Sequence, residues 1–385
     1  MLHEVFWKNP GYKVRESLTG DITCDYLIVG GGITGVALAY FLSSSGAKNI
    51  VLVEKGFIGD GATGKSAGIL TVRGELDLTQ IIKLYGRKKG LAYWDINKEG
   101  LSLVASIVKK EKLNCDFELQ DTLFGSISDE GCDYVLKEYL EEKKIEKSSC
   151  LLTGEAIKKE IISPLFKQVV ISKNHAISVN PRKHVQSLSE AVAKKGVRIY
   201  EHTGVSSIRG SVAQTAGGNI TFKKIIRAVD VFSKVKDIRN RKSTIAISEP
   251  LSKKQIASIG LSRKKIIWDS EQEYHYLKLT KEGRLMVGFG DKILNKKHNR
   301  TIPLTSHFRE IERFIKKIFP QLEIEIAYAW SGIFGTTDNL IPSVQKTQNG
   351  FVIGGAGSQI MCVVLAKHIA DVLLNRKTKL DSFFG

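Results

Sequence analysis

A short strand followed by a glycine-rich turn and a helix is the feature that most limits how this chain can fold. Residues 25–29 (DYLIV) form an apolar β-type run, and residues 29–35 (VGGGITG) have the spacing G-x-G-x-x-G. Apolar residues then recur at helical spacing as far as Gly46, and a second β-type run (NIVLVEK) ends at Lys55. This order predicts the first βαβ unit of a parallel, doubly wound sheet.

The glycine spacing also predicts a dinucleotide site. Gly30 permits a tight turn, Gly32 lets a pyrophosphate approach the backbone, and Gly35 lets the helix pack closely on the strand. The helix begins near Ile33 and Thr34, where free N–H groups and the positive end of the helix dipole attract anions.

Glu54 lies 19 residues after the last of these glycines, at the end of the second strand. A carboxylate there accepts hydrogen bonds from both hydroxyls of an adenosine ribose and repels a 2′-phosphate. Up to this point a nicotinamide and a flavin dinucleotide both remain possible. The next segment, residues 56–70 (GFIGDGATGKSAGIL), is a glycine-rich loop rather than an ordinary helix, and its backbone can closely approach a ligand. This loop favours a flavin.

A second strand, glycine turn and helix occur at the C-terminal end. Residues 351–353 (FVI) are β-type, residues 354–358 (GGAGS) form a turn, and a helix is expected from Gln359. Ile360 stands where a third glycine would complete the G-x-G-x-x-G spacing. We therefore expect this helix to face the far end of the same cofactor.

Length and composition set the outer limits. A chain of 385 residues is expected to form two domains, and 42% hydrophobic with 25% charged residues is typical of a soluble globular protein. No segment approaches the roughly 20 apolar residues of a membrane span, and the N-terminus has no apolar signal segment. We expect a cytoplasmic protein. The five cysteines contain no C-x-x-C pair and the eight histidines no ligand-like cluster, so we expect no metal.

Positive charge gathers between residues 223 and 265, where thirteen Lys or Arg face three acidic residues. Such a stretch could attract nucleic acid or another polyanion. Aromatic residues for base stacking are scarce within it. We interpret the stretch as a solvated surface and do not expect a nucleic-acid partner.

Six segments, in this order, resemble the FAD-dependent D-amino-acid oxidase (DAO) superfamily, the branch of glycine oxidase, sarcosine oxidase and γ-glutamylputrescine oxidoreductase. The resemblance extends along nearly the whole chain. The segments are 25–42 (DYLIVGGGITGVALAYFL), 51–70 (VLVEKGFIGDGATGKSAGIL), 176–208 (AISVNPRKHVQSLSEAVAKKGVRIYEHTGVSSI), 274–291 (YHYLKLTKEGRLMVGFGD), 329–344 (AWSGIFGTTDNLIPSV) and 351–374 (FVIGGAGSQIMCVVLAKHIADVLL).

The resemblance implies an α/β fold with two parts. A Rossmann-like FAD-binding domain would be built from residues 1–85, 150–230 and 325–385, and a second, mostly antiparallel α+β substrate domain from residues 86–149 and 231–324. The cofactor would be FAD, held non-covalently. The implied cofactor-binding residues are Gly30, Gly32, Ile33, Thr34, Gly35, Glu54, Lys55, Gly61, Ala62, Thr63, Gly64, Lys65, Ser66, Val205, Gly332, Gly355, Gly357, Ser358 and Gln359.

The implied activity is oxidation of the C–N bond of a small amine or amino acid. Hydride would pass to flavin N5, water would hydrolyse the resulting imine, and oxygen or another acceptor would take the electrons. A substrate carboxylate needs an arginine, for which Arg73 and Arg284 are the candidates. Tyr274 and Tyr276 are candidates to close the substrate pocket.

Two departures from the family pattern bear on this activity. Met286 stands where relatives carry a lysine that activates oxygen, which leaves a dehydrogenase open. The segment at residues 228–230 (AVD) replaces a glycine-containing turn near the cofactor. The alternatives are an FAD-dependent 2-hydroxy-acid or glycerol-phosphate dehydrogenase, and a nucleic-acid-associated flavoprotein or an inactive binding protein.

Overall fold

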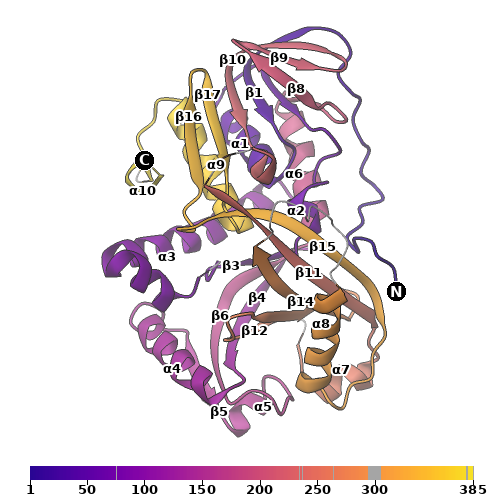
Figure 1. The fold of residues 1–385 in the computed structure, drawn as a ribbon, viewed down its shortest axis with the longest axis vertical. Helices are drawn as coiled ribbons and strands as arrows, with labels where there is room; N and C mark the ends of the chain where they lie inside the picture. Colours follow the sequence, from indigo (N-terminus) through magenta and orange to yellow (C-terminus); the bar gives the residue numbers. More distant parts are fainter. Residues whose placement is uncertain are drawn as a thin grey trace.

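The computed structural model describes residues 1–74, 76–233, 235, 237–262, 264–293, 305–378 and 380–384. Two β-sheets organise these residues and lie one above the other in Figure 1. One sheet is largely parallel and the other is mostly antiparallel. The predicted fold class, a Rossmann-like α/β part with a second, mostly antiparallel part, is confirmed.

The first sheet contains the predicted βαβ unit. Strand β1 is central, with β2 and then β7 on one side and β10, β17 and β16 on the other. The pairs β1–β2, β2–β7, β1–β10 and β10–β17 are parallel, and a β8–β9 hairpin extends from β10. The bounds are β1 Ile22–Val29, β2 Ile50–Val53, β7 Arg198–Tyr200, β8 Val205–Arg209, β9 Val212–Thr215, β10 Gly218–Arg227, β16 Ser343–Thr347 and β17 Gly350–Gly354.

Helix α1 (Ile33–Ser44) forms where the sequence predicts it and is buried along most of its length. It lies between α6 (Pro181–Lys194) and α9 (Gln359–Leu373), and α9 also contacts α3 (Leu78–Lys110). These helices and the strands of the first sheet enclose the largest apolar core. A helix that contacts protein on nearly every side can be apolar throughout, which explains why α1 has no polar stripe.

The second sheet has the order β15-β11-β14-β13-β12-β4-β6-β3, with β5 beside β6, and only the β4–β12 pair is parallel among the pairs described. Its helices are α4, α5, α7 and α8, and α8 covers β14 and β11. The strand bounds are β3 Ile69–Thr71, β4 Glu118–Ser126, β5 Cys150–Thr153, β6 Gln168–Ser178, β11 Ile238–Pro250, β12 Lys265–Asp269, β13 His275–Leu279, β14 Arg284–Ile293 and β15 Ile326–Thr337. The helix bounds are α4 Asp129–Lys143, α5 Glu155–Lys158, α7 Lys253–Ile259 and α8 Thr305–Ile318.

Two short helical turns, α2 (Ala62–Lys65) and the 3₁₀ turn η1 (Asp230–Phe232), lie at the junction of the two sheets, and α10 (Asp381–Phe384) ends the described chain. The sequence ranges expected to bind FAD contain every strand of the first sheet. They also contain β3, β5, β6 and β15, which pair in the second sheet. The ranges expected to bind FAD therefore contribute strands to both sheets.

The basic stretch at residues 223–265 is divided between the two sheets. Most of its Lys and Arg residues lie on β10, β11, α7 and β12, while Lys234, Lys236 and Arg263 fall outside the described residues. Several of its side chains are paired, Lys223 with Asp25 and Lys265 with Glu160. In the described part of the chain, no helix has the length and apolar character to cross a membrane.

Candidate functional site

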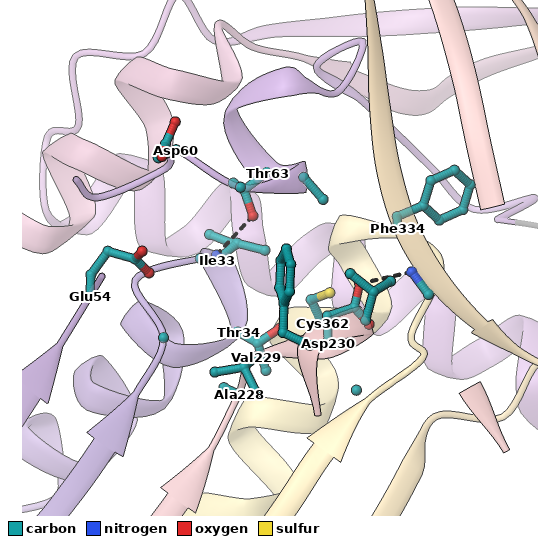
Figure 2. A pocket seen from close by; sticks show the side chains of 18 of the residues that line it. Ile33, Thr34, Glu54, Asp60, Thr63, Ala228, Val229, Asp230, Phe334 and Cys362 are labelled. Atoms are coloured by element: carbon teal, nitrogen blue, oxygen red, sulfur yellow. Dashed lines mark hydrogen bonds between the residues drawn. The ribbon is translucent and has the colours of Figure 1, made fainter. Parts of the chain in front are cut away.

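A cleft of about 770 Å3 lies where the carboxyl ends of the parallel strands face the second sheet. The ends of β1, β2, β10 and β17 line one side, and β11 and β15 line the other. Figure 2 shows Glu54 and Asp60 at one end of this cleft and Phe334 at the other. Ligands of open α/β sheets bind at this edge of the strands, and cofactor-sized sites are roughly 300–1,000 Å3.

The glycine turn between β1 and α1 borders the cleft. Gly30 has a φ of +119°, and a side chain on it would overlap the carbonyl oxygen of Ala228. Gly35 is packed so tightly that a Cβ would overlap the carbonyl oxygen of Gly30. The turn therefore requires glycine at both positions, and it directs the start of α1 toward the cleft.

Glu54 lies at the end of β2 with both carboxylate oxygens fixed. Its Oε2 accepts a hydrogen bond from the backbone N–H of Gly31 at 2.7 Å, and its Oε1 accepts one from Gly56 at 2.9 Å. Each carboxylate oxygen can accept more than one hydrogen bond, so both keep capacity for a ligand hydroxyl. This geometry suits a ribose.

The same end of the cleft has an aromatic wall that the sequence did not predict. Phe232 is 58% exposed and lines the cleft together with Val205 and Lys55. The Nζ atom of Lys55 lies 3.5 Å from the centre of the Phe232 ring. The Lys55–Phe232 pair and the Val205 side chain give this end of the cleft a surface that suits a flat ring such as adenine.

The loop at residues 60–68, which we call the central loop, crosses the middle of the cleft and includes α2. Thr63 ties it to the first sheet, since its Oγ1 accepts a hydrogen bond from the backbone N–H of Ile33 at 3.0 Å. Two indoles hold it from the other side: Trp330 Nε1 donates to the Lys65 carbonyl and Trp7 Nε1 to the Ser66 carbonyl, both at 2.8 Å. Neither tryptophan was predicted, because both lie far from the loop in sequence.

The turn after β17 forms the remaining wall. Ser358 caps α9 by accepting a hydrogen bond from the backbone N–H of Met361 at 3.2 Å. Gln359, the first residue of α9, donates from Nε2 to the Ser66 hydroxyl at 2.6 Å. The turn and the central loop are therefore joined directly at the cleft surface.

Asp230 in η1 replaces the glycine that the family pattern places near the cofactor. Its φ is +45°, and its two carboxylate oxygens accept hydrogen bonds from the backbone N–H groups of Gly335 and Gly355 at 2.8 and 2.9 Å. Burial raises its pKa, and the backbone hydrogen bonds oppose that rise. Asp230 and Cys362 both line the cleft (Figure 2).

Most of the residues expected to contact the cofactor come together at this cleft. Gly35, Gly64 and Gly355 are the exceptions, since they do not line it. The expected residues that do line it are Gly30, Gly32, Ile33, Thr34, Glu54, Lys55, Gly61, Ala62, Thr63, Lys65, Ser66, Val205, Gly332, Gly357, Ser358 and Gln359.

Arg73 is placed outside the cleft lining. Its side chain is 3% exposed, and its guanidinium pairs with Asp77 at 3.1 Å, Glu138 at 2.8 Å and Glu142. The guanidinium carbon lies 4.8 Å from the centre of the Phe124 ring. Burial alone would lower the pKa of Arg73, but the three carboxylates outweigh it and raise that pKa.

Arg284 also lies outside the cleft lining. Its Nη1 donates to the Ser248 carbonyl at 2.9 Å and to Glu249 Oε2 at 3.1 Å, and its guanidinium packs on Phe6. Neither arginine offered for a substrate carboxylate is therefore placed at the cleft surface.

Tyr276 lies just behind the cleft wall. Its hydroxyl is 3.4 Å from the hydroxyl of Ser243, which lines the cleft, and its ring lies over Gly288, where any Cβ would overlap it. The ring of Tyr274 is 6.3 Å away from that of Tyr276. His275, between them, points to the opposite face and packs between Phe289 and Phe314.

Met286 is buried on β14, and the strand register places Lys278 of β13 directly opposite it. Met286 itself carries no charge, but a lysine side chain lies beside it on the neighbouring strand. Lys278 Nζ donates to Ser178 Oγ at 2.6 Å and to the Gly68 carbonyl at 3.4 Å. Sequence reasoning missed this lysine because the β-sheet register across the seven residues between Lys278 and Met286 was not predicted.

Among the described residues, no group of three or more His, Cys, Asp or Glu side chains has the arrangement of a metal site.

Comparison with known proteins gives consistent matches along the whole chain. A family model described as FAD dependent oxidoreductase (DAO) matches residues 25–372. The γ-glutamylputrescine oxidoreductase of Escherichia coli K12 is 26% identical over 97% of this chain and 88% of its own length. The glycine oxidase of Bacillus licheniformis is 24% identical over 93% of this chain and 95% of its own length.

Solved structures share the fold. Glycine oxidase from Geobacillus kaustophilus superposes with a TM-score of 0.79 at 18% identity, covering 94% of this chain and 98% of that one. L-proline dehydrogenase from P. horikoshii gives a TM-score of 0.77 at 18% identity, covering 95% and 96%. L-α-glycerophosphate oxidase from Mycoplasma pneumoniae, described with FAD bound, gives 0.74 at 18% identity, covering 92% and 96%.

Proposed function

Because this chain belongs to the DAO family of FAD-dependent oxidoreductases, we propose that it oxidises the C–N bond of a small amine or amino acid with FAD held non-covalently in the cleft. The observation that carries this proposal is the cleft itself, with a dinucleotide turn at its centre and a substrate-facing wall from a second sheet at one end. The names of the γ-glutamylputrescine and glycine enzymes support the same reaction class.

The residues of the cleft fit FAD in one direction. The pyrophosphate would lie at the start of α1, where Gly32 lines the cleft and the positive end of the helix dipole attracts anions. The adenosine would then extend toward Glu54 and the Phe232–Lys55 wall, because Glu54 retains acceptor capacity for ribose hydroxyls. The flavin ring would lie at the other end, between Ser66, Gln359 and β15.

Bound FAD would supply a two-electron acceptor that takes hydride from a carbon next to nitrogen. The chain's own residues then have to orient the amine, exclude water during transfer and admit it for hydrolysis of the imine. No protein base is required for the hydride step, provided that the amine reacts in its neutral form. This agrees with a cleft wall made largely of apolar side chains and hydroxyls.

We assign the substrate side to the wall formed by β11, β15 and β13. Ile245, Ile333 and Phe334 supply its apolar surface, and the Ser243 hydroxyl, 3.4 Å from the Tyr276 hydroxyl behind it, supplies its polar group. Arg73 and Arg284 are proposed to stabilise the fold rather than bind a substrate carboxylate, because their guanidinium groups are already paired with carboxylates away from the cleft.

The direct test is anaerobic reduction of the purified flavoprotein by a panel of primary amines, secondary amines, amino acids, 2-hydroxy acids and glycerol phosphate. We expect at least one amine or amino acid to bleach the flavin band at about 450 nm. Re-oxidation by oxygen, compared with an artificial acceptor, then separates oxidase from dehydrogenase activity. Bleaching by hydroxy acids or glycerol phosphate alone would replace the proposal with the other reaction, which the shared fold of the glycerophosphate oxidase permits.

Two matched variants extend this test to the substrate wall. Tyr276→Phe removes the hydroxyl beside Ser243, and Tyr274→Phe makes the same change on the neighbouring ring. We expect slower flavin reduction or weaker substrate binding only for the first, by a factor of about 10 for one lost hydrogen bond of about 1 kcal/mol or slightly more. Equal rates of flavin reduction and equal substrate binding in the two variants would show that the Tyr276 hydroxyl has no role in substrate binding.

A further inference from the structure

We propose that Lys278 is a positioning residue of the flavin end of the cleft: a buried ammonium that holds the exit of the central loop and gives the substrate wall a positive charge. This inference rests on the proposed function, because it concerns the cleft in its FAD-bound form. Lys278 does not line the cleft, so it would act through the loop and through its charge.

The position of Lys278 follows from the strand register. Lys278 is opposite Met286, and Met286 is opposite Ile247, so these three side chains share one face of the second sheet. Ile245 is two residues from Ile247 on β11 and lines the cleft. Because alternate residues of a strand share a face, Lys278 belongs to the row next to the cleft wall, about 7 Å along the strands.

The contacts of Lys278 connect it to the central loop. Its Nζ donates to the carbonyl of Gly68, the last residue of that loop, and to the hydroxyl of Ser178 at the end of β6. The Gly68 carbonyl also accepts the backbone N–H of Val179 at 2.9 Å. With the Trp7 and Trp330 indoles on the preceding carbonyls, Lys278 completes a set of donors that fixes the loop from the side of the second sheet.

Among the residues that the structure describes, no carboxylate forms a direct ion pair with this ammonium. Lys278 is 1% exposed, its hydrogen-bond partners are a carbonyl and a hydroxyl, and Nζ lies 5.7 Å from the centre of the Trp7 ring. The carboxylates that act on it from a distance are Glu118 of β4 and Glu282 of the β13–β14 turn. A buried cation without a carboxylate partner is costly, and such groups concentrate at functional sites.

Protonation of Lys278 should stabilise negative charge at the flavin end of the cleft. Reduction of a flavin by two electrons and one proton leaves one negative charge, which a nearby cation stabilises in a medium of low dielectric constant. Burial lowers the pKa of Lys278 to about 7, while Glu118 and Glu282 oppose that shift. The charge is therefore present below neutral pH and lost above it.

The experiment measures the flavin midpoint potential of the holoprotein at about pH 6 and about pH 9, on either side of this titration. Wild type should have a more positive potential than Lys278→Met at the lower pH and the same potential at the higher pH. Lys278→Arg keeps its positive charge at both pH values. Its flavin midpoint potential should match that of wild type at the lower pH and be more positive than that of wild type at the higher pH. Asp230 is a second ionisable group at the cleft, so a pH dependence of the wild-type potential alone would not identify Lys278 as its cause. The comparison with the Lys278 variants does.

Lys242→Met is the matched control. Lys242 is also 1% exposed in the same sheet, but it precedes Ser243, so its side chain points to the face away from the cleft. The flavin midpoint potential of Lys242→Met should equal that of wild type at both pH values. If the three Lys278 proteins keep the same potential at both pH values, the proposal is wrong. If no protein binds FAD, the proposed function itself fails, and the two outcomes are distinct.

A second readout does not need the cofactor. In the apoprotein, the unfolded chain retains a proton on Lys278 up to about pH 10.4, whereas the native state loses it at about pH 7. The unfolded state therefore binds more protons in this window, and thermal stability should rise from pH 7 toward pH 10. Lys278→Met should lack this rise; a rise of equal size in both proteins would show that Lys278 is not the buried ammonium inferred here.

Discussion

Arg73 illustrates how far a single residue can be interpreted from sequence. Its position just after the glycine-rich loop suggested a substrate contact, because a carboxylate needs a guanidinium partner. The structure surrounds it instead with Glu138 and Glu142, which come from a helix more than sixty residues away. Such a partner set is invisible without tertiary structure, whereas Gly30 and Gly35 have local requirements and could be predicted from spacing alone.

Replacing Arg73 by methionine should strongly destabilise the protein. The substitution leaves two buried glutamates without their cation, which typically costs about 3–5 kcal/mol. Arg284→Met is the control, since the Glu249 partner of Arg284 is 56% exposed and surface pairs contribute about 0–1 kcal/mol. Urea unfolding of both variants measures the difference. Unchanged stability of Arg73→Met, together with a raised KM, would instead indicate that Arg73 binds the substrate.

At the scale of elements, the strand, glycine turn and helix at each end of the chain form where the sequence predicts them. Their signals are local: apolar strands, glycines at fixed spacing and helical periodicity. The second sheet was predicted only as mostly antiparallel, because its order brings β3 and β15 from distant segments to opposite edges. The short turn η1 was not predicted, although it joins elements of both sheets through Asp230.

Asp230→Ala should therefore loosen the cleft. It leaves the buried N–H groups of Gly335 and Gly355 without an acceptor, at a cost of about 1–3 kcal/mol each. We expect a lower melting temperature and weaker FAD binding, both measurable in one flavin titration followed by thermal unfolding. Asp338→Ala removes a carboxylate that is 70% exposed at the end of β15 and should change neither quantity. Parallel behaviour of the two variants would contradict the role of η1.

For the molecule as a whole, the central claim is that the cleft between the two sheets holds FAD without a covalent bond. The glycine turn, Glu54 and the central loop were all available from sequence. The Phe232–Lys55 wall and the indoles of Trp7 and Trp330 were not, because each depends on contacts between segments far apart in the chain. Glu54 and the Phe232–Lys55 wall, at the proposed adenosine end, are the reason to expect tighter binding of FAD than of FMN.

Titration of the apoprotein with FAD, FMN and NAD, followed by flavin absorbance and by competition, tests this claim most directly. FAD should bind most tightly and be released intact when the protein is denatured. FMN should bind weakly, because it lacks the adenosine that reaches Glu54 and Phe232, and Glu54→Gln should weaken FAD much more than FMN. Equal binding of FAD and FMN, displacement of FAD by NAD, or flavin that stays attached to the denatured chain would contradict the account.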